Sequence, residues 1–185
     1  MPYTNPWKTL SSAVKYDNPW IRLTEHQVLN PRGGEGIYGV VHFKNFAIGI
    51  AALDEEKNIY LIGQYRFPLN GFSWEIPEGG GPLEENDPLK SAKRELLEET
   101  GLLAESWRVI LRMHLSNSVS DELGILYLAT GLTQREAQPE DTEELYLKKM
   151  PFAAAVEMVE NGDITDSLSV AAILKIQLML LKGEY

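Results

Sequence analysis

The sequence predicts an α/β fold in which a small β segment, residues 1–45, precedes a larger domain, residues 46–185. Three observations support this prediction. Apolar runs of strand length recur from residue 46 to residue 132, residues 87–101 carry the start and stop signals of a helix, and helical patterns return after residue 150. A chain of 185 residues is long enough for one domain with a substantial core and a small appended piece.

The N-terminal segment contains short strands only. We expect strands at residues 11–15, 20–29 and 37–43, separated by Asp17-Asn-Pro and by Pro31-Arg-Gly-Gly. A segment this small does not bury a core of its own. We therefore expect it to pack on the main domain or on a second subunit.

The main domain is expected to open with a hairpin-like pair of buried strands, at residues 46–53 and 58–66. Residues 72–77 lead directly into the stretch that begins at Gly79. Further strands are predicted at 106–115, 124–132 and 145–149, with a polar loop at 116–123 and an acidic loop at 133–144. A short helix at 151–160 and a final helix capped by Asp166 or Ser167 complete the domain. The predicted packing face of the final helix is Leu168, Ala171, Ala172, Leu174 and Leu178.

The helix predicted at residues 87–101 gathers carboxylates on one side. Asp87 suits the N-cap, Pro88 the first helical position and Gly101 the C-terminal turn. Its acidic residues follow at helical spacing, which places their Cβ atoms roughly 5–6 Å apart; they are Glu95, Glu98 and Glu99. Like charges this close need a counter-charge, and oxygen ligands in a chain without Cys suit Mg²⁺ or Mn²⁺ better than Zn²⁺. The ordinary alternative is a solvated acidic face.

Two further groups of residues complete the prediction for this helix. Arg94 lies four residues before Glu98 and is expected to pair with it. The stripe expected to hold the helix on the core consists of Leu89, Ala92, Leu96 and Leu97.

The spacing in this helix resembles the signature of the Nudix hydrolases, G-x5-E-x7-R-E-U-x-E-E-x-G-U with U aliphatic. The residues in register are Arg94, Glu95, Leu96, Glu98, Glu99, Gly101 and Leu102. The first Glu of the signature falls on Asn86 counted back from Arg94, or on Glu85 counted forward from Gly79 with one extra residue. In the family this Glu resembles a structural brace, so the departure concerns loop geometry more than metal binding. The resemblance implies a Nudix-type α/β/α sandwich with a mixed β-sheet.

Flanking segments resemble the ADP-ribose and nucleoside-diphosphate-sugar pyrophosphatase branch of that family. They are Tyr16-Asp-Asn-Pro-Trp-Ile-Arg, Gln64-Tyr-Arg-Phe and Phe72-Ser-Trp-Glu-Ile-Pro. The resemblance implies a Mg²⁺-dependent pyrophosphatase that splits a nucleotide sugar, such as ADP-ribose or GDP-mannose, into a nucleoside monophosphate and a sugar phosphate. It also implies a homodimer that exchanges its N-terminal strands.

The resemblance and the residues together suggest roles at a diphosphate site. We expect Glu95 and Glu99 to bind metal, Glu98 to share one ion and so take part in catalysis, and the backbone carbonyl of Glu78 to add a ligand. The resemblance implies a general base from the acidic loop, with Glu140 and Glu143 as the leading candidates and Asp141 and Glu144 behind them.

Four residues outside the helix are candidates for substrate contacts. Arg66 could hold a phosphate oxygen, with a surface ion pair as the alternative. Trp20 and Tyr16 could stack on a nucleobase, although aromatic residues in short strands often belong to a core. Glu122 could contact a metal or a ribose, or could simply lie on a loop surface.

Composition excludes several other classes. The formal net charge of −10 argues against a nucleic-acid surface, while a bound cation still permits a phosphate substrate. Without Cys, a long apolar run or a signal-like N-terminus, we expect a cytoplasmic protein with no membrane segment. Two other functions stay open: a nucleotide-binding sensor of the same fold without catalysis, which Asn86 favours, and a Nudix enzyme for another nucleoside diphosphate derivative.

Overall fold

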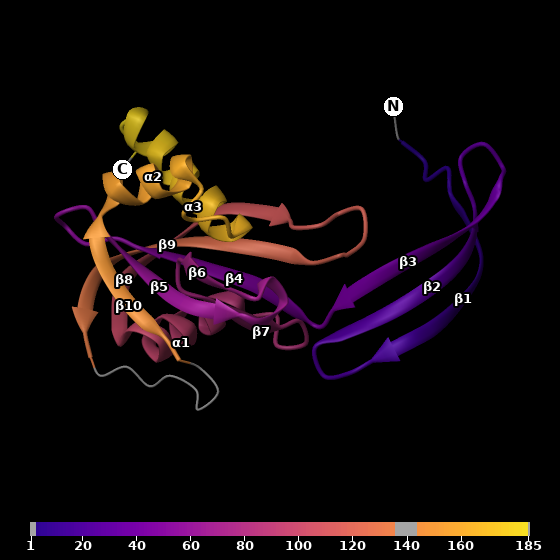
Figure 1. The fold of residues 1–185 in the computed structure, drawn as a ribbon, viewed down its shortest axis with the longest axis horizontal. Coiled ribbons are helices and arrows are strands. Elements are labelled where there is room, and N and C mark those ends of the chain that lie inside the picture. Colours follow the sequence, from indigo (N-terminus) through magenta and orange to yellow (C-terminus); the bar gives the residue numbers. More distant parts are fainter. Residues whose placement is uncertain (1–2, 136–143, 185) are drawn as a thin grey trace. The chain divides into compact units, whose positions relative to one another are not determined.

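The structure is a computed structural model of the chain, and it describes residues 3–135 and 144–184. The chain forms two compact units (Figure 1). The N-terminal unit contains residues 1–45 and 114–123, and the main unit contains residues 46–113 and 124–185.

The N-terminal unit is a three-stranded antiparallel sheet in the order β1-β2-β3. Its strands are β1 (Lys8–Asp17), β2 (Ile21–Leu29) and β3 (Glu35–Phe43), which confirms the strands expected there. Polar side chains shape both turns: Asn18 Oδ1 accepts hydrogen bonds from the backbone after β1, and Asn30 Oδ1 does the same after β2. Residues 114–123 join this sheet through a parallel bridge between Val41 and Ser120.

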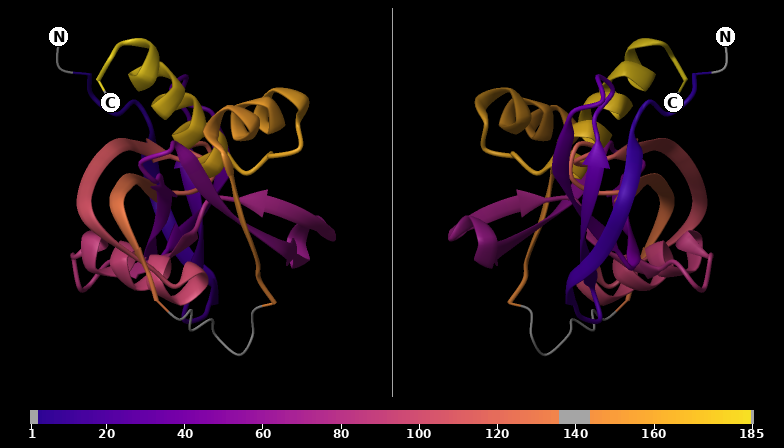
Figure 2. Two further views of the ribbon diagram at one scale, coloured as in Figure 1. Left: turned by 90° about the vertical axis from the view of Figure 1, so that its left-hand side faces the viewer. Right: turned by 90° about the vertical axis from the view of Figure 1, so that its right-hand side faces the viewer.

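The main unit contains two sheets between helices (Figures 1 and 2). One sheet has the order β10-β5-β6 and is antiparallel, and the other has the order β7-β4-β9-β8, with β4 and β9 parallel. Helix α1 lies on one side of the sheets, and α2 and α3 lie on the other. This arrangement confirms the α/β sandwich with a mixed sheet.

The strands of the main unit are β4 (Asn45–Ala52), β5 (Asn58–Arg66), β6 (Gly71–Glu75), β7 (Glu78–Pro82), β8 (Leu102–His114), β9 (Leu123–Gln134) and β10 (Tyr146–Pro151). The helices are α1 (Pro88–Thr100), α2 (Phe152–Asn161) and α3 (Ser167–Leu181), and a single 3₁₀ turn covers Phe67–Leu69. Among the described residues, no helix has the length and apolar character needed to cross a membrane.

The expected hairpin-like pair of β4 and β5 is correct only at its turn. Leu53 and Ile59 form an antiparallel bridge and Asp54 N donates to Asn58 O at 3.1 Å, but the two strands then belong to different sheets. Both strands are apolar enough to be central, so each takes two other neighbours. Between them, the Asp54 carboxylate accepts hydrogen bonds from the backbone N–H groups of Glu56 (3.0 Å) and Asn58 (2.8 Å), which holds the turn where the sheets separate.

The expected packing face of α3 is correct only in part. Leu168 and Ala172 are buried and Ala171 is half-buried, but Leu174 is 47% exposed and Leu178 is 45% exposed. The helix is apolar nearly all round, so its sequence pattern does not define one face. The buried side of the helix also includes Ser169, Ile173, Ile176 and Met179.

Candidate functional site

Helix α1 has the boundaries that its sequence predicts. The Asp87 side chain accepts a hydrogen bond from Lys90 N at 3.1 Å, and Pro88 occupies the first turn. Gly101 has a φ of 69° and donates to Leu97 O at 2.9 Å, which ends the helix. Of the predicted apolar stripe, Ala92 and Leu96 are buried and the other two residues are half-buried.

Two of the three carboxylates on α1 face the interior. Glu95 is 9% exposed and Glu99 is 6% exposed, whereas Glu98 is half-buried. The helix packs on β7, a strand that consists largely of glycine. A Cβ atom on Gly79 would lie 2.0 Å from Glu95 Cδ, so the absence of a side chain there makes room for the carboxylate.

Arg94 connects the acidic face of α1 to β7. Its Nη1 donates to Glu98 Oε2 at 2.6 Å, and its Nη2 donates to Glu95 Oε1 at 2.5 Å and to the carbonyl oxygen of Gly80 at 3.0 Å. The predicted pair between Arg94 and Glu98 is thus present. The guanidinium offsets the repulsion between the two carboxylates and fixes both against the strand.

The loop before α1 gives a structural reason for the unusual residue in the Nudix signature. Asn86 has a φ of 47°, in the left-handed region where Asn is favoured, and it leads directly into the N-cap Asp87. Glu85 is exposed and pairs with Lys90 Nζ at 3.0 Å. The residue that departs from the signature therefore shapes the turn that leads into α1.

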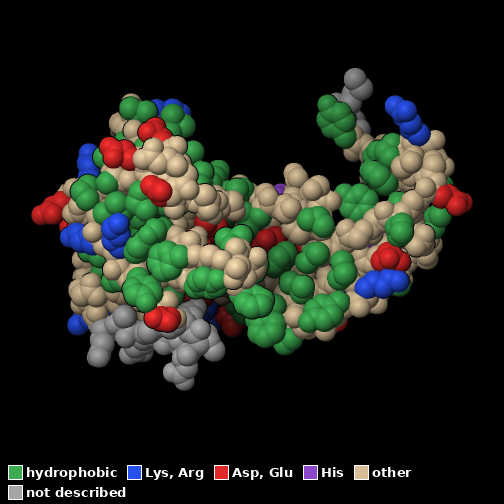
Figure 3. Space-filling view, in the orientation of Figure 1, with side chains coloured by type: hydrophobic (Ala, Val, Ile, Leu, Met, Phe, Trp, Pro, Cys, Tyr) green, Lys and Arg blue, Asp and Glu red, His purple; other side chains and the backbone are tan. Residues whose placement is uncertain are grey.

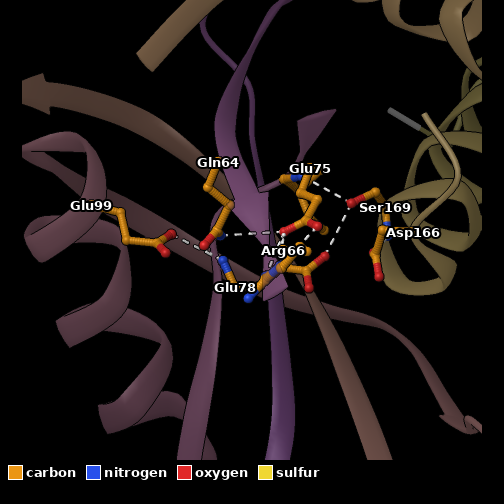
Figure 4. A network of polar contacts seen from close by, with 8 residues as sticks. Gln64, Arg66, Glu75, Glu78, Glu99, Asp166 and Ser169 are labelled. Atoms are coloured by element: carbon orange, nitrogen blue, oxygen red, sulfur yellow. Dashed lines mark hydrogen bonds and ion pairs between the residues drawn. The ribbon is translucent and has the colours of Figure 1, made fainter. Parts of the chain in front are cut away.

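The third carboxylate of α1 belongs to a polar network that runs between two helices (Figure 4). Glu99 Oε2 accepts a hydrogen bond from the backbone N of Glu78 at 3.0 Å. The Glu78 side chain points the other way, where its Oε1 accepts from Ser169 Oγ at 3.0 Å. Burial, together with the neighbouring carboxyl of Asp166, raises the pKa of Glu78 well above its usual range and favours its protonated form.

Asp166 is the N-cap of α3 and closes this network. Its Oδ2 accepts from Ser169 N at 2.8 Å. Burial alone would raise the pKa of Asp166, but hydrogen bonds from Glu78 and Ser169 outweigh that effect and lower it. The pKa values of these two neighbouring carboxyl groups are therefore shifted in opposite directions.

Arg66 is held in a fixed orientation at the end of β5. Its Nε lies 3.0 and 3.1 Å from the two carboxylate oxygens of Glu75, and its Nη2 lies 2.5 Å from Oε2. Glu75 is only 2% exposed, so this pair is not the surface ion pair considered as an alternative. The guanidinium borders a cavity of about 410 Å³, within the range of small-molecule sites, which is lined by Arg66, Pro68, Leu69, Glu75, Thr165, Asp166 and Ser167.

The donor atoms of the α1 face suit a hard cation in chemistry. All three are carboxylates, two of them buried, beside the backbone carbonyls of a glycine-rich strand. In the described part of the chain, no three His, Cys, Asp or Glu side chains are gathered closely enough to hold a metal ion as they stand. Glu95 and Glu98 pair with Arg94, and Glu99 Oε2 accepts a hydrogen bond from the backbone N of Glu78, so these contacts orient all three carboxylates.

Three predicted substrate residues lie in the N-terminal unit. Tyr16 is 53% exposed and Trp20 is 65% exposed, so neither contributes to a core within the described chain. Glu122 is half-buried, and burial followed by the charge of Asp121 raises its pKa. The substrate contacts expected of these three residues stay predictions.

The candidates for the general base fall mostly outside the described residues. This applies to Glu140, Asp141 and Glu143. Glu144 is described: it is exposed and accepts a hydrogen bond from Tyr146 Oη at 2.7 Å.

Sequence reasoning missed the parts of the site that hold the α1 carboxylates in place. It did not identify β7 as a strand, the partner of Arg66 in Glu75, or the buried Ser169 between α3 and the glycine-rich strand. One signal was available, because Ser169 lies in a largely apolar helix within one turn of its N-cap.

Comparison with known proteins identifies the class. Residues 7–41 match the nucleoside diphosphate sugar hydrolase N-terminal domain, and residues 44–167 match the NUDIX domain. The chain therefore belongs to the Nudix hydrolases and carries the N-terminal domain of the nucleoside diphosphate sugar hydrolases. Enzymes of this family typically depend on a divalent metal.

Individual relatives cover most of the chain. It is 33% identical to an ADP-ribose pyrophosphatase of Mycobacterium tuberculosis over 173 residues, covering 92% of this chain and 83% of the relative. It is 30% identical to a methanol dehydrogenase activator of Bacillus methanolicus over 174 residues, covering 92% of each. A crystal structure of an ADP compounds hydrolase superimposes with a TM-score of 0.82 at 17% identity, over 100% of this chain and 98% of the other, and so shares the fold.

Proposed function

We propose that this protein is a divalent-metal-dependent pyrophosphatase that splits a nucleoside diphosphate sugar of the ADP-ribose or GDP-mannose type into a nucleoside monophosphate and a sugar phosphate. The observation that carries the proposal is the burial of Glu95 and Glu99 on one face of α1. Carboxylate oxygens are the ligands that Mg²⁺ prefers in proteins, and this face presents them at helical spacing, so it is expected to bind a divalent cation. The match of the N-terminal residues to nucleoside diphosphate sugar hydrolases supports the substrate class.

The residues of the chain take distinct parts in this reaction. Glu95, Glu98 and Glu99, with the carbonyl of Glu78, would hold the metal. When bound, Mg²⁺ offsets the charge of the diphosphate and lowers the pKa of a bound water. Arg94 orients Glu95 and Glu98 through its paired hydrogen bonds.

Other residues would bind the substrate and activate the water. Arg66, whose guanidinium Glu75 holds beside a cavity, offers hydrogen bonds to a phosphate oxygen. We assign base stacking to Tyr16 and Trp20, a polar contact to Glu122, and the general base to Glu140 or Glu143.

A homodimer is part of the proposal. The N-terminal sheet exposes many large apolar side chains (Figure 3), among them Leu10, Val14, Tyr16, Trp20 and Ile37. Apolar exposure of this extent is expected to be covered by another protein surface. Light scattering after gel filtration should give twice the mass of one chain, and a monomeric mass at micromolar concentration would contradict the dimer.

The substrate assignment is tested by product analysis. The protein is incubated with Mg²⁺ and, separately, ADP-ribose, GDP-mannose, dNTPs and diadenosine polyphosphates, and the products are separated by ion-exchange chromatography. We expect AMP and ribose 5-phosphate from ADP-ribose, or GMP and mannose 1-phosphate from GDP-mannose. Turnover of dNTPs alone, or of none of these compounds, would discard the substrate class. Hydrolysis of another nucleoside diphosphate derivative would retain the chemistry and change the substrate.

A second candidate is a Nudix-fold sensor that binds a nucleotide without cleaving it, which the residue Asn86 in the signature keeps open. Replacing Glu99 by Gln separates the two functions. An enzyme should lose orders of magnitude in kcat, whereas a sensor should change only in ligand affinity. Glu160→Gln, an exposed position on α2, is the matched control and should leave both quantities unchanged.

A further inference from the structure

We propose that Ser169 is a positioning residue: from helix α3 it fixes the backbone of residues 76–78, and through that backbone it sets the Glu99 carboxylate for metal binding. The inference rests on the proposed function, because it concerns the same carboxylate. It adds a role for α3, a helix that contributes no proposed metal ligand.

The first step is the contact between α3 and the segment that joins β6 to β7. Ser169 is fully buried, and its Oγ accepts a hydrogen bond from Ile76 N at 2.9 Å while lying 3.0 Å from Glu78 Oε1. A hydroxyl has one proton, so it accepts from Ile76 and donates to Glu78. Its own backbone N donates to Asp166 Oδ2 at 2.8 Å, which fixes Ser169 at the start of the helix.

The second step carries this restraint to the metal-binding helix (Figure 4). Glu78 N donates to Glu99 Oε2 at 3.0 Å, so a shift of the segment moves the donor that orients the Glu99 side chain. On another side, Ile50 N donates to the carbonyl of Pro77 at 2.8 Å, which anchors the segment to β4. Residues 76–78 are thus held by hydrogen bonds from three directions, and Ser169 supplies the one that comes from α3.

The third step is the requirement of the metal. A carboxylate ligand binds an ion well only when its rotamer is held, and the groups that orient ligands typically change metal affinity by about 10–100-fold. Two readings of Ser169 then differ in outcome. A structural role alone predicts a lower melting temperature with unchanged metal affinity, and a positioning role predicts weaker metal binding in protein that is still folded.

The test measures Mn²⁺ binding to the free protein by electron paramagnetic resonance, and separately the Mg²⁺ concentration that gives half the maximal hydrolysis rate. Ser169→Ala should weaken Mn²⁺ binding by about tenfold, raise the half-saturating Mg²⁺ concentration similarly, and lower kcat with little change in KM. Ser169→Thr keeps the hydroxyl and should restore most of the affinity. Ser169→Cys has a side chain of similar size but a much weaker hydrogen-bond donor, so it should not restore the Mn²⁺ affinity.

Ile173→Ala provides the matched control on the same helix. Ile173 is fully buried one turn after Ser169, and its truncation removes only apolar contacts. It should lower the melting temperature at least as much as Ser169→Ala, while Mn²⁺ affinity stays within twofold of the original protein. If Ser169→Ala does not fold, the comparison of the Thr and Cys variants decides the question.

The outcomes separate this inference from the proposed function. Mn²⁺ affinity in Ser169→Ala equal to that of Ile173→Ala would overturn the positioning role, even where hydrolysis is observed. A second outcome is a protein that cleaves no nucleotide sugar but binds Mn²⁺ tightly, with this binding removed by Glu99→Gln and weakened by Ser169→Ala. That outcome would retain the positioning role and reject the enzymatic function. A protein that binds no Mn²⁺ on α1 would reject the positioning role.

Discussion

Replacing Gly79 by Ala tests whether the glycine-rich strand β7 exists to admit the Glu95 carboxylate. The added Cβ would lie 2.0 Å from Glu95 Cδ and Oε1, whereas ordinary contact begins at 3.4 Å. The carboxylate must therefore withdraw by about 1.4 Å, the difference between 3.4 and 2.0 Å. Gly79 is not among the residues with positive φ, so the new residue brings no backbone strain.

The cost of this change should appear in activity more than in stability. The new Cβ would also lie 2.5 Å from Glu95 Cγ, so the whole side chain must turn, and an off-rotamer side chain costs about 0.5–1.5 kcal/mol. The same displacement breaks the 2.5 Å contact with Arg94 Nη2 and moves a proposed metal ligand. A misplacement of about 1 Å in a catalytic site can reduce the rate by about 100-fold, so we expect kcat to fall by that order.

The assay combines Mg²⁺-dependent hydrolysis of the preferred nucleotide sugar with thermal unfolding of the same preparation. Gly36→Ala is the matched control, because nothing lies within 4 Å of a Cβ there, and it should change neither quantity. If Gly79→Ala retains the original kcat and Mg²⁺ dependence, then Glu95 is not a ligand whose position β7 sets. A large drop in melting temperature would instead show that β7 and α1 cannot shift to accommodate the added methyl group.

Three further changes probe neighbouring interactions. Arg94→Lys should lower kcat/KM about tenfold, because one ammonium group cannot replace a guanidinium that donates hydrogen bonds to three acceptors. An unchanged kcat/KM in steady-state kinetics would refute this. Glu75→Gln leaves Arg66 with a neutral partner and should reduce the free energy of unfolding in urea by up to about 3 kcal/mol; a loss below about 0.5 kcal/mol would contradict a structural pair. Burial would raise the pKa of Asp54, but hydrogen bonds from Lys149 and Asn58 lower it from 3.8 to about 2. Its stabilising effect is therefore present above pH 3.8 and lost as pH falls toward 2, so Asp54→Asn should lower the melting temperature near neutral pH, with a gap that closes in acid.

The parts of the fold that were predictable depend on local chemistry. Helix α1 was located from Asp87, Pro88 and Gly101 because a helix starts and stops through contacts within one turn of each end. The register of Glu95 and Glu99 followed from helical geometry alone. The central strands β4 and β5 were also readable, because long apolar runs of this kind are buried in a core.

The remaining features depend on contacts between distant residues. Strand β7 has no strand propensity because it is largely glycine, and its close packing on α1 explains why: a Cβ on Gly79 would meet Glu95, and a Cβ on Gly81 would meet Ser91. The neighbours of β4 and β5 in the sheets depend on where the other strands lie, which the apolar runs of β4 and β5 do not indicate. The contact between Ser169 and Ile76 joins residues 93 positions apart, so no local pattern could have revealed it.

The structure also separates the chemistry from the choice of substrate. In the main unit, the polar groups around α1 are engaged with one another: Arg94 with Glu95, and Glu99 with Glu78. In the proposed function these groups act on the metal and the diphosphate, and not on the sugar or the base. The exposed aromatic residues of the N-terminal unit, by contrast, have little to stabilise within their own sheet, as the 65% exposure of Trp20 shows. Differences in substrate among relatives with this fold are therefore expected to arise in the N-terminal unit, where a side chain can change without disturbing the carboxylates.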